Sequence, residues 1–523
     1  MRQQSELMFR WFFPALFLLS GGCPFPAEIQ PPPLLQSSSI ISFDLPTGKS
    51  PATEVFPFGV ASGDPLPEAV ILWTMLDTLS WKNDSLVHWE LSNSADFSDI
   101  RQRGKTIAKR GRRCRVKVDV RGLTPGTVYY YRFQNSGKFS STGRTRTMPR
   151  PQQPAEIKLA VVSCNALEWG YMNAYEQIAA RADLDAVIHL GDYIYEYASG
   201  VYGDTTLGRF HEPRHEVITE QDYHQRYAQY RRDPQLQAAH EAHPFICVWD
   251  DHEVANNSYR EGAENHTLEE GDYLKRMTSA KQVYYDWMPI REQVNGAIYR
   301  RFSFGSTAEL HMLDERLAGR DAPAQNFEPG ALADTTRHML GTEQFEWLCN
   351  GLRNSTARWQ LIGNQVLFAS LDLSNILPEY AVNLDAWDGY AYEQARLLDS
   401  LSTYDNPNTI FLTGDTHCSW YFDVNDGAGD RIATEFGTPS VSSANYDEFI
   451  GGWDTLAVAR YRLYRDNEHL HYTNIKDHGY LLLALKPEEV KATFHFSRTI
   501  RTRDSRPGSV KSFTLPYVYP HAR

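Results

Sequence analysis

The chain has 523 residues, carries a net charge of −13 and is 42% hydrophobic. At about 150 residues per domain, this length predicts more than one structural unit, and the composition is that of a globular protein. The negative charge argues against a surface for nucleic acid or anionic lipid headgroups. An anionic substrate would need local positive charge, for which bound metal ions are the compact source.

Residues 1–23 resemble an export signal. The apolar run from Trp11 to Gly22 is shorter than a membrane span and suits a signal peptide, although no twin-arginine pair precedes it. Small residues before Cys23 resemble a lipoprotein cleavage site. We therefore expect export to the periplasm or cell envelope, with a lipid anchor at Cys23 as the only membrane contact. Plain secretion and a retained N-terminal anchor are the alternatives.

Residues 24–54 are rich in Pro, Ser and Gln and predict an extended linker. Residues 55–150 then show short alternating or β-branched runs such as VHWELS, RVKVDV and TVYYYRFQ. The turn from Leu123 to Tyr129 resembles the L-x-P-G-x-x-Y signature of fibronectin-III-like domains. This segment is therefore predicted to be a small fibronectin-III-like β-sandwich.

Residues 155–500 alternate apolar strands with helical patterns, and residues 501–523 are expected to be a tail. Helical spacing is seen over 169–181 and 220–243. The predicted strands are 157–164, 184–190, 244–250, 308–314, 359–369 and 409–414, and 479–497 predicts a strand, a turn and a second strand. Continuous apolar strands separated by helices predict an α/β domain whose sheet is covered on both faces.

Potential metal ligands follow the apolar strands directly. Cys164 ends the first strand, Asp192 follows the second, Asp251 the third, and Asp415 and His417 the last. Alone, each is a common feature: a strand-end cysteine is usually a small buried hydrophobe, and Gly-Asp is often a turn. Because strand ends open onto one edge of an α/β sheet, together they predict a metal site.

These strings resemble a known family. The motifs resemble those of calcineurin-like metallophosphoesterases, in the form found in alkaline phosphatase D (PhoD-like) proteins. The matching strings are VSCN, HLGDYIYEY, WDDHEVANN and LTGDTHCSW. WQLIGNQV, GTPSVSS and FGVASGDP also fit, so the resemblance covers roughly residues 55–500. It implies a four-layer αββα sandwich behind the N-terminal β-sandwich.

The resemblance also implies roles for residues. Asp192 would bridge two metals, and Cys164, Tyr195 and His417 would complete the site of a ferric ion. Asp251 and Asp415 would hold calcium, with zinc and manganese as less favoured ions. The implied catalytic residues are His252, which would protonate the leaving group or stabilise the transition state, together with Asp251 and Asn165. Further candidates for phosphate or calcium contacts are Asn256 and Asn257.

The implied function is that of an exported phosphoesterase, which hydrolyses phosphate mono- or diesters by in-line attack of a metal-bound hydroxide. The substrate would be a small phosphate ester or a lipid or polymer phosphodiester. Two alternatives stay open. One is a purple-acid-phosphatase-like enzyme with an Fe–Zn or Fe–Fe site, which would want His in place of Asp415 and Asp in place of Cys164. The other is a catalytically dead, surface-anchored binding protein.

Substrate choice is expected to lie in long loops over 197–219, 257–271 and 317–336, which could roof the site or be plain surface loops. Arg316 and Arg320 follow the strand over 308–314. They are candidates for phosphate contacts, with an ion-pair or surface role as the alternative.

Overall fold

A computed structural model describes residues 55–77, 83–326, 328–376, 381–404, 406–450 and 453–519. The predicted export signal and linker, residues 1–54, lie outside the described residues. Within the described part of the chain, no helix is both long enough and apolar enough to cross a membrane.

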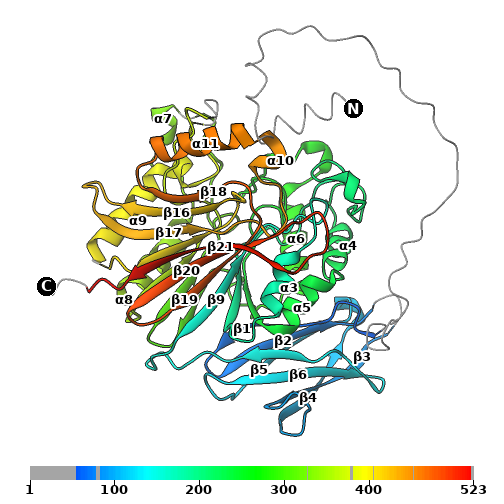
Figure 1. Ribbon diagram of the computed structural model, residues 1–523. Helices are drawn as coiled ribbons and strands as arrows, with labels where there is room; N and C mark the ends of the chain where they lie inside the picture. Colours follow the sequence, from blue (N-terminus) through cyan, green and yellow to red (C-terminus); the bar gives the residue numbers. More distant parts are fainter. Residues whose placement is uncertain are drawn as a thin grey trace, which may run out of the picture.

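Two large sheets form the centre of the molecule (Figure 1). The first has nine strands in the order β21 (Pro507–Pro516), β20 (Glu489–Ser497), β19 (Gly479–Leu485), β9 (Ile157–Val162), β10 (Ala186–His189), β11 (Pro244–Cys247), β1 (Val60–Leu66), β2 (Ala69–Met75) and β5 (Arg115–Arg121). The second has seven strands in the order β12 (Arg300–Phe304), β13 (Ala308–Met312), β14 (Trp359–Gly363), β15 (Thr409–Thr413), β17 (Arg431–Gly437), β16 (Ser419–Asn425) and β18 (Leu470–Asn474). β21 lies within the stretch expected to be a tail and pairs antiparallel with β20.

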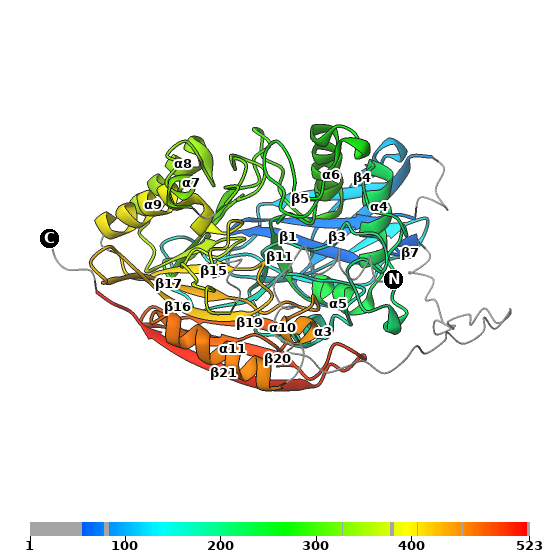
Figure 2. The same cartoon turned by 90° about the horizontal axis from the view of Figure 1, so that it is seen from above.

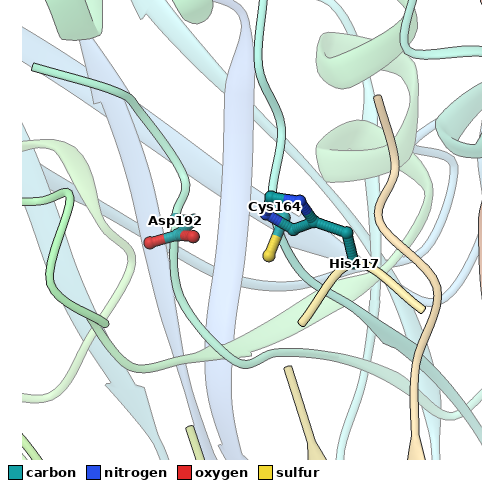
Figure 3. Close-up of side chains that lie close together, drawn as sticks. All are labelled: Cys164, Asp192 and His417. Atoms are coloured by element: carbon teal, nitrogen blue, oxygen red, sulfur yellow. The ribbon is translucent and has the colours of Figure 1, made fainter. Parts of the chain in front are cut away.

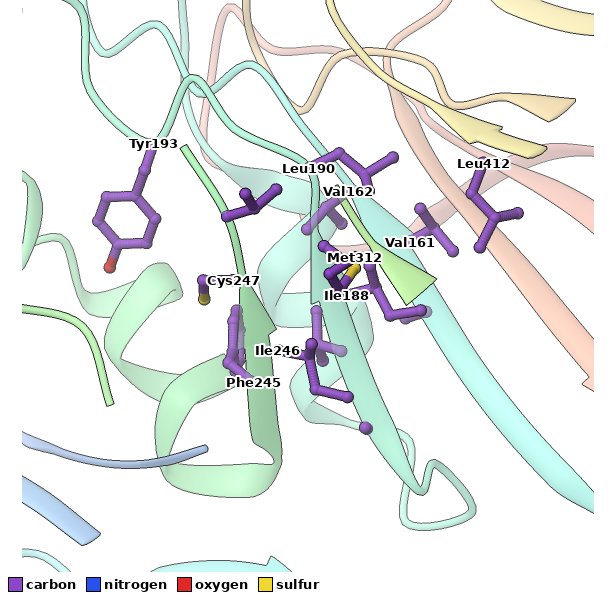
Figure 4. Close-up of a cluster of buried hydrophobic side chains, with 14 of the residues drawn as sticks. Val161, Val162, Ile188, Leu190, Tyr193, Phe245, Ile246, Cys247, Met312 and Leu412 are labelled. Atoms are coloured by element: carbon purple, nitrogen blue, oxygen red, sulfur yellow. The ribbon is translucent and has the colours of Figure 1, made fainter. Parts of the chain in front are cut away.

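The two sheets pack face to face through one apolar core. β9, β10 and β11 run parallel, and β10 and β11 are buried at every position, as their continuous apolar sequences predict. Val161 and Ile188 of the nine-stranded sheet share a hydrophobic cluster with Met312 of β13 and Leu412 of β15 in the other sheet (Figure 4). This shared core fixes the strand ends of the two sheets relative to each other.

Helices cover the outer faces of both sheets and complete four layers. They are α3 (Asn173–Ala179), α4 (Glu220–Tyr230), α5 (Pro234–Ala242), α6 (Tyr273–Trp287), α7 (Pro329–Leu332), α8 (Gly341–Asn354), α9 (Ala391–Tyr404), α10 (Tyr446–Ile450) and α11 (Trp453–Asp466). α3 and α5 pack on the nine-stranded sheet, whereas α8, α9 and α11 share a second core with the seven-stranded sheet. In Figure 1, α8 and α9 lie on one side of the paired sheets and α3 to α6 on the other.

The N-terminal strands form a sandwich that is continuous with the nine-stranded sheet. A smaller sheet of β4 (Ile100–Ala108), β3 (Ser85–Ser92), β6 (Val128–Asn135), β7 (Lys138–Phe139) and β8 (Gly143–Arg146) shares a core with β1, β2 and β5. β1 also pairs in parallel with β11. In the view from above, β1, drawn in blue, lies beside β11 of the central sheet (Figure 2). One face of the N-terminal sandwich is therefore part of the nine-stranded sheet.

Two predicted elements differ from the structure. The single helix expected over 220–243 is two helices, because Asp233 caps α5 by accepting hydrogen bonds from the backbone of Gln235 and Leu236, and Pro234 begins it. The strand expected over 359–369 ends at Gly363. Beyond that residue, the backbone N–H groups at 365 and 366 bind the Glu315 carboxylate instead of a neighbouring strand.

Candidate metal centre

The site lies where four strands of the two large sheets end. Cys164, Asp192 and Asp251 follow the neighbouring parallel strands β9, β10 and β11. Asp415 and His417 follow β15 of the facing sheet. Because parallel strands present their carboxyl ends at one edge, the two packed sheets bring these side chains to a common place.

Cys164, Asp192 and His417 form what we call the inner group. Their ligand atoms all lie within 4.8 Å of one another, and all three side chains are buried (Figure 3). The Tyr195 hydroxyl donates a hydrogen bond to Oδ2 of Asp192 at 3.1 Å and lies 3.3 Å from Nε2 of His417. Nδ1 of His417 is 2.7 Å from the Ala444 carbonyl oxygen, so it donates there and leaves Nε2 free as a ligand. The structure thus gathers the four residues that the resemblance assigns to iron.

Two further groups of potential ligand residues overlap with the inner group, and the three groups together form what we call the row. The middle group is Asp192, Asp251 and His252, and the outer group is Asp250, Asp251 and Asp415, each with ligand atoms within 4.8 Å of one another. Asp192 belongs to the inner and middle groups, and Asp251 to the middle and outer groups. The Asp415 side chain is 22% exposed, so the row opens to solvent at the outer group.

His252 is held by a buried carboxylate. Its Nδ1 lies 2.7 Å from Oε2 of Glu196, whose side chain is fully buried. Oε1 of Glu196 accepts hydrogen bonds from the Asn256 backbone at 2.7 Å and from Nδ2 of Asn265 at 3.1 Å. Burial alone would lower the pKa of His252, but the carboxylates of Asp251, Glu196 and Asp192 raise it well above its ordinary value. The imidazole is therefore stabilised as a cation beside the ligand groups.

The carboxylates of the row fit metal ions. Burial raises the pKa of Asp192 well above its ordinary value, that of Asp250 to about 8 and that of Asp415 to about 7. Among the described residues, Oδ1 of Asp192 and Oδ2 of Asp250 have no hydrogen-bond partner, although both are buried. Unpartnered buried oxygens are costly. A cation would bind them and favour the ionised carboxylates, and the carboxylate, imidazole, phenol and thiol donors are all metal ligands.

The backbone is strained at the same positions. Cys164, Asp192, Asp415 and His417 have positive φ angles of 61°, 55°, 59° and 62°. Residues other than glycine rarely adopt this conformation, which costs about 1–3 kcal/mol each and concentrates at functional sites. The strain lies in the short turns directly after the strands, where it holds ligand side chains at the sheet edge.

The three asparagines named from the sequence surround the row but are engaged in hydrogen bonds. Asn165 donates to the Tyr193 carbonyl at 3.2 Å and accepts from the Tyr175 hydroxyl at 2.7 Å. The Asn257 backbone N–H donates to Oδ2 of Asp251 at 2.6 Å. The Asn256 and Asn257 side-chain amides both donate to Glu264. The loop over 257–271 therefore contacts the site, whereas Asn165 ties two strand ends together.

Arg316 and Arg320 are buried and bound to carboxylates. Neither side chain is exposed. Arg316 contacts Asp250 through Nε and both oxygens of Asp385 at 2.8 Å, and Arg320 donates to Asp385 at 2.5 Å. The ion-pair alternative thus describes both side chains in this structure.

Sequence reasoning missed three acidic residues at the site. Asp250 belongs to the outer group, and Glu196 holds His252. Glu253 accepts backbone hydrogen bonds from residues 192, 193 and 250, and so joins the turns after β10 and β11. All three lie inside the strings GDYIYE and DDHE. Their position beside expected ligands was the only signal, since nothing local distinguishes a ligand from the residue that supports it.

Comparison of folds places this architecture among known enzymes. A solved structure of PhoD superposes with a TM-score of 0.80 at 32% identity, covering 89% of this chain and 91% of that chain. A purple acid phosphatase from yellow lupin (Lupinus luteus) seeds superposes with a TM-score of 0.56 at 13% identity, covering 88% and 73%. This second likeness shows the fold alone. The predicted four-layer metallophosphoesterase fold behind a β-rich N-terminal domain is confirmed, and the class is that of phosphoric ester hydrolases.

Sequence comparison identifies the family. The model of the PhoD-like phosphatase matches residues 159–494, and that of its N-terminal domain matches residues 43–149. Alkaline phosphatase D of Bacillus subtilis (strain 168) is 34% identical over 504 residues, which cover 92% of this chain and 84% of that protein. The chain belongs to the PhoD-like phosphatase family, as its strand-end motifs predict.

Proposed function

We propose that this chain is an exported, metal-dependent phosphoesterase that hydrolyses phosphate mono- and diesters. The observation that carries the proposal is the continuous row of three ligand groups at the strand ends. A phosphate ester is an anion and the protein has a net charge of −13, so cations at this row are the compact means of attracting it. The same row argues against a catalytically dead binding protein, because its donors converge and remain buried.

Two kinds of metal suit the two ends of the row. Iron(III) suits the inner group with Tyr195, since thiolate and phenolate are anionic donors. Calcium suits the outer group, because its three residues offer only carboxylate oxygens. A purple-acid-phosphatase-like Fe–Zn site would want a nitrogen donor where Asp415 stands. The all-oxygen outer group therefore favours iron with calcium over that alternative.

The bound cations would lower the pKa of a water molecule and neutralise the oxygens of the ester phosphate. His252 is positioned to donate a proton to the leaving-group oxygen, because neighbouring carboxylates keep it protonated. Glu196 holds the imidazole through Nδ1. Asp192, shared by two groups, sets the spacing between the inner and middle groups.

Export rests on the signal-like residues 1–23, with lipidation at Cys23 as the expected anchor. In that setting the substrate would be a small phosphate ester or a lipid or polymer phosphodiester. Labelling with a radioactive fatty acid, compared between the natural chain and Cys23→Ala, tests the anchor. Label that persists in the variant would contradict it.

The central test is hydrolysis of p-nitrophenyl phosphate and bis(p-nitrophenyl) phosphate with and without a chelator, together with metal analysis. We expect chelation to abolish activity, and Asp192→Ala to lower kcat/KM about 1,000-fold or more, as for loss of a central electrostatic group. Asp183→Asn, which removes a surface carboxylate paired with Lys158, should retain activity. Full activity of metal-free protein would overturn the proposal.

A further inference from the structure

Arg316 stands against the outer group from inside the protein. It follows β13, and its side chain is not exposed to solvent. Nε contacts Oδ1 of Asp250, and Nη2 lies 3.4 Å from Oδ1 of Asp415 and 3.9 Å from Oδ1 of Asp251. One guanidinium therefore faces all three members of the outer group.

A further carboxylate, that of Asp385, binds the guanidinium of Arg316 and lies outside the outer group. Nη1 of Arg316 donates to both oxygens of Asp385 at 2.8 Å, and Arg320 binds the same carboxylate. A guanidinium clamped in this way keeps its planar donors in fixed directions. Arg316 is thus a fixed charge rather than a mobile one.

The charges of this arrangement match one kind of ion. The three ionised carboxylates of the outer group carry three negative charges, and Arg316 offsets one of them. Asp385 is matched by Arg320, and the imidazolium of His252, which lies beside Asp251, is matched by Glu196. Two uncompensated negative charges remain at the outer group. They balance the charge of a divalent cation, whereas a trivalent cation would leave one positive charge uncompensated.

We propose that Arg316 is a positioning residue that shapes the outer group and restricts it to divalent cations. This inference rests on the proposed metal dependence and adds a specific cause for the selectivity of one end of the row. Because the guanidinium contacts all three carboxylates and offsets part of their mutual repulsion, the outer group is preorganised before an ion arrives. Within the described part of the chain, no arginine forms an ion pair with the inner group, whose ligand set suits a trivalent ion.

The test is binding of Ca²⁺ and of La³⁺ to the full chain, measured by calorimetry after loosely held divalent ions have been removed with a chelator. Arg316→Met removes the charge, and we expect the preference for La³⁺ over Ca²⁺ to rise about tenfold or more. Arg316→Lys keeps the charge but loses the planar fork. It should weaken Ca²⁺ binding about tenfold while leaving the La³⁺ to Ca²⁺ preference within about twofold of the natural chain.

The matched control is Arg300→Lys. Arg300 is also a buried arginine, paired with Asp64 at 2.7 Å, but it contacts no member of the outer group. It should change neither affinity, which separates selectivity from general loss of packing. Circular dichroism establishes that each variant is folded. If Arg316→Met does not fold, Arg316→Lys decides alone through its loss of Ca²⁺ affinity.

The inference is overturned if the Arg316 variants bind both ions as the natural chain does, or if the Arg300 control shifts equally. A natural chain that binds neither ion would overturn the proposed calcium site of the outer group, and this inference with it, whereas metal dependence itself is tested separately by the effect of chelation on activity. Binding by the natural chain with unchanged variants would remove the role of Arg316 alone.

Discussion

Replacing Glu196 with Gln removes the negative charge that holds His252 while keeping the shape of the side chain. A unit charge about 4 Å away contributes about 4 kcal/mol at an effective dielectric constant of about 20. Bound cations and the remaining carboxylates would reduce the net effect to about 1.4–2.8 kcal/mol, or one to two pH units. Removing an anion destabilises the imidazolium, so the pKa of His252 must fall.

The assay is kcat/KM for phenyl phosphate as a function of pH. If protonated His252 supplies the leaving group, activity is lost as pH rises through its pKa, so the variant should lose activity one to two pH units earlier. The rate near the optimum should fall about 100-fold. The kcat/KM for p-nitrophenyl phosphate should fall less, because its much less basic leaving group needs little protonation.

Glu168→Gln is the matched control for Glu196→Gln. Glu168 is also a buried carboxylate, but it accepts its hydrogen bonds from Ser199, Gly200 and His211 and makes none to His252. Loss of the Glu168 charge should not change the pH at which kcat/KM falls on the alkaline side of the profile, which we call the basic limb. A basic limb that stays fixed or moves to higher pH in Glu196→Gln would refute the reasoning, as would equal losses for the two substrates.

Three further predictions follow from the site and its turns. Removing the metals with a chelator should lower thermal stability, by about 4 kcal/mol if the ions saturate the site 1,000-fold above Kd; an unchanged melting temperature would contradict this. Iron-loaded protein should show a visible charge-transfer band that Tyr195→Phe abolishes, and a band that persists would exclude Tyr195 as a ligand. Gly191→Ala should cost about 2–4 kcal/mol in urea unfolding, because a Cβ there would lie 2.4 Å from Asp250 at a φ of 113°. Gly126→Ala, at a positive φ but with open space, should cost only about 1–2 kcal/mol.

Strand positions and the ligand set were the most predictable features. Runs such as LDAVIHL and TIFLTG are continuously apolar because their strands are buried on both faces, and polar donors directly after them must lie at the sheet edge. That reasoning names Cys164, Asp192, Asp251, Asp415 and His417 without any structure, and all five lie in the row.

Features that depend on distant partners could not be predicted in this way. Arg316 meets Asp385, which lies 69 residues further along the chain, and Glu196 meets His252 from another strand end. The sequence shows each as an isolated charge. The continuity of β1 with β11 was likewise hidden, because a composition change near residue 150 marks a boundary along the chain and not in the sheet.

The pairing of β1 with β11 has a consequence for biosynthesis. During translation β1 emerges long before β11, and every strand between Leu66 and Pro244 must be made before the central sheet can close. One edge of β1 therefore stays unpaired until β11, which directly precedes the turn with Asp250 and Asp251, has been synthesised. Deleting this segment would uncover the edge of β11, next to the turn that holds these two acids, so the larger domain depends on the N-terminal segment to complete its sheet.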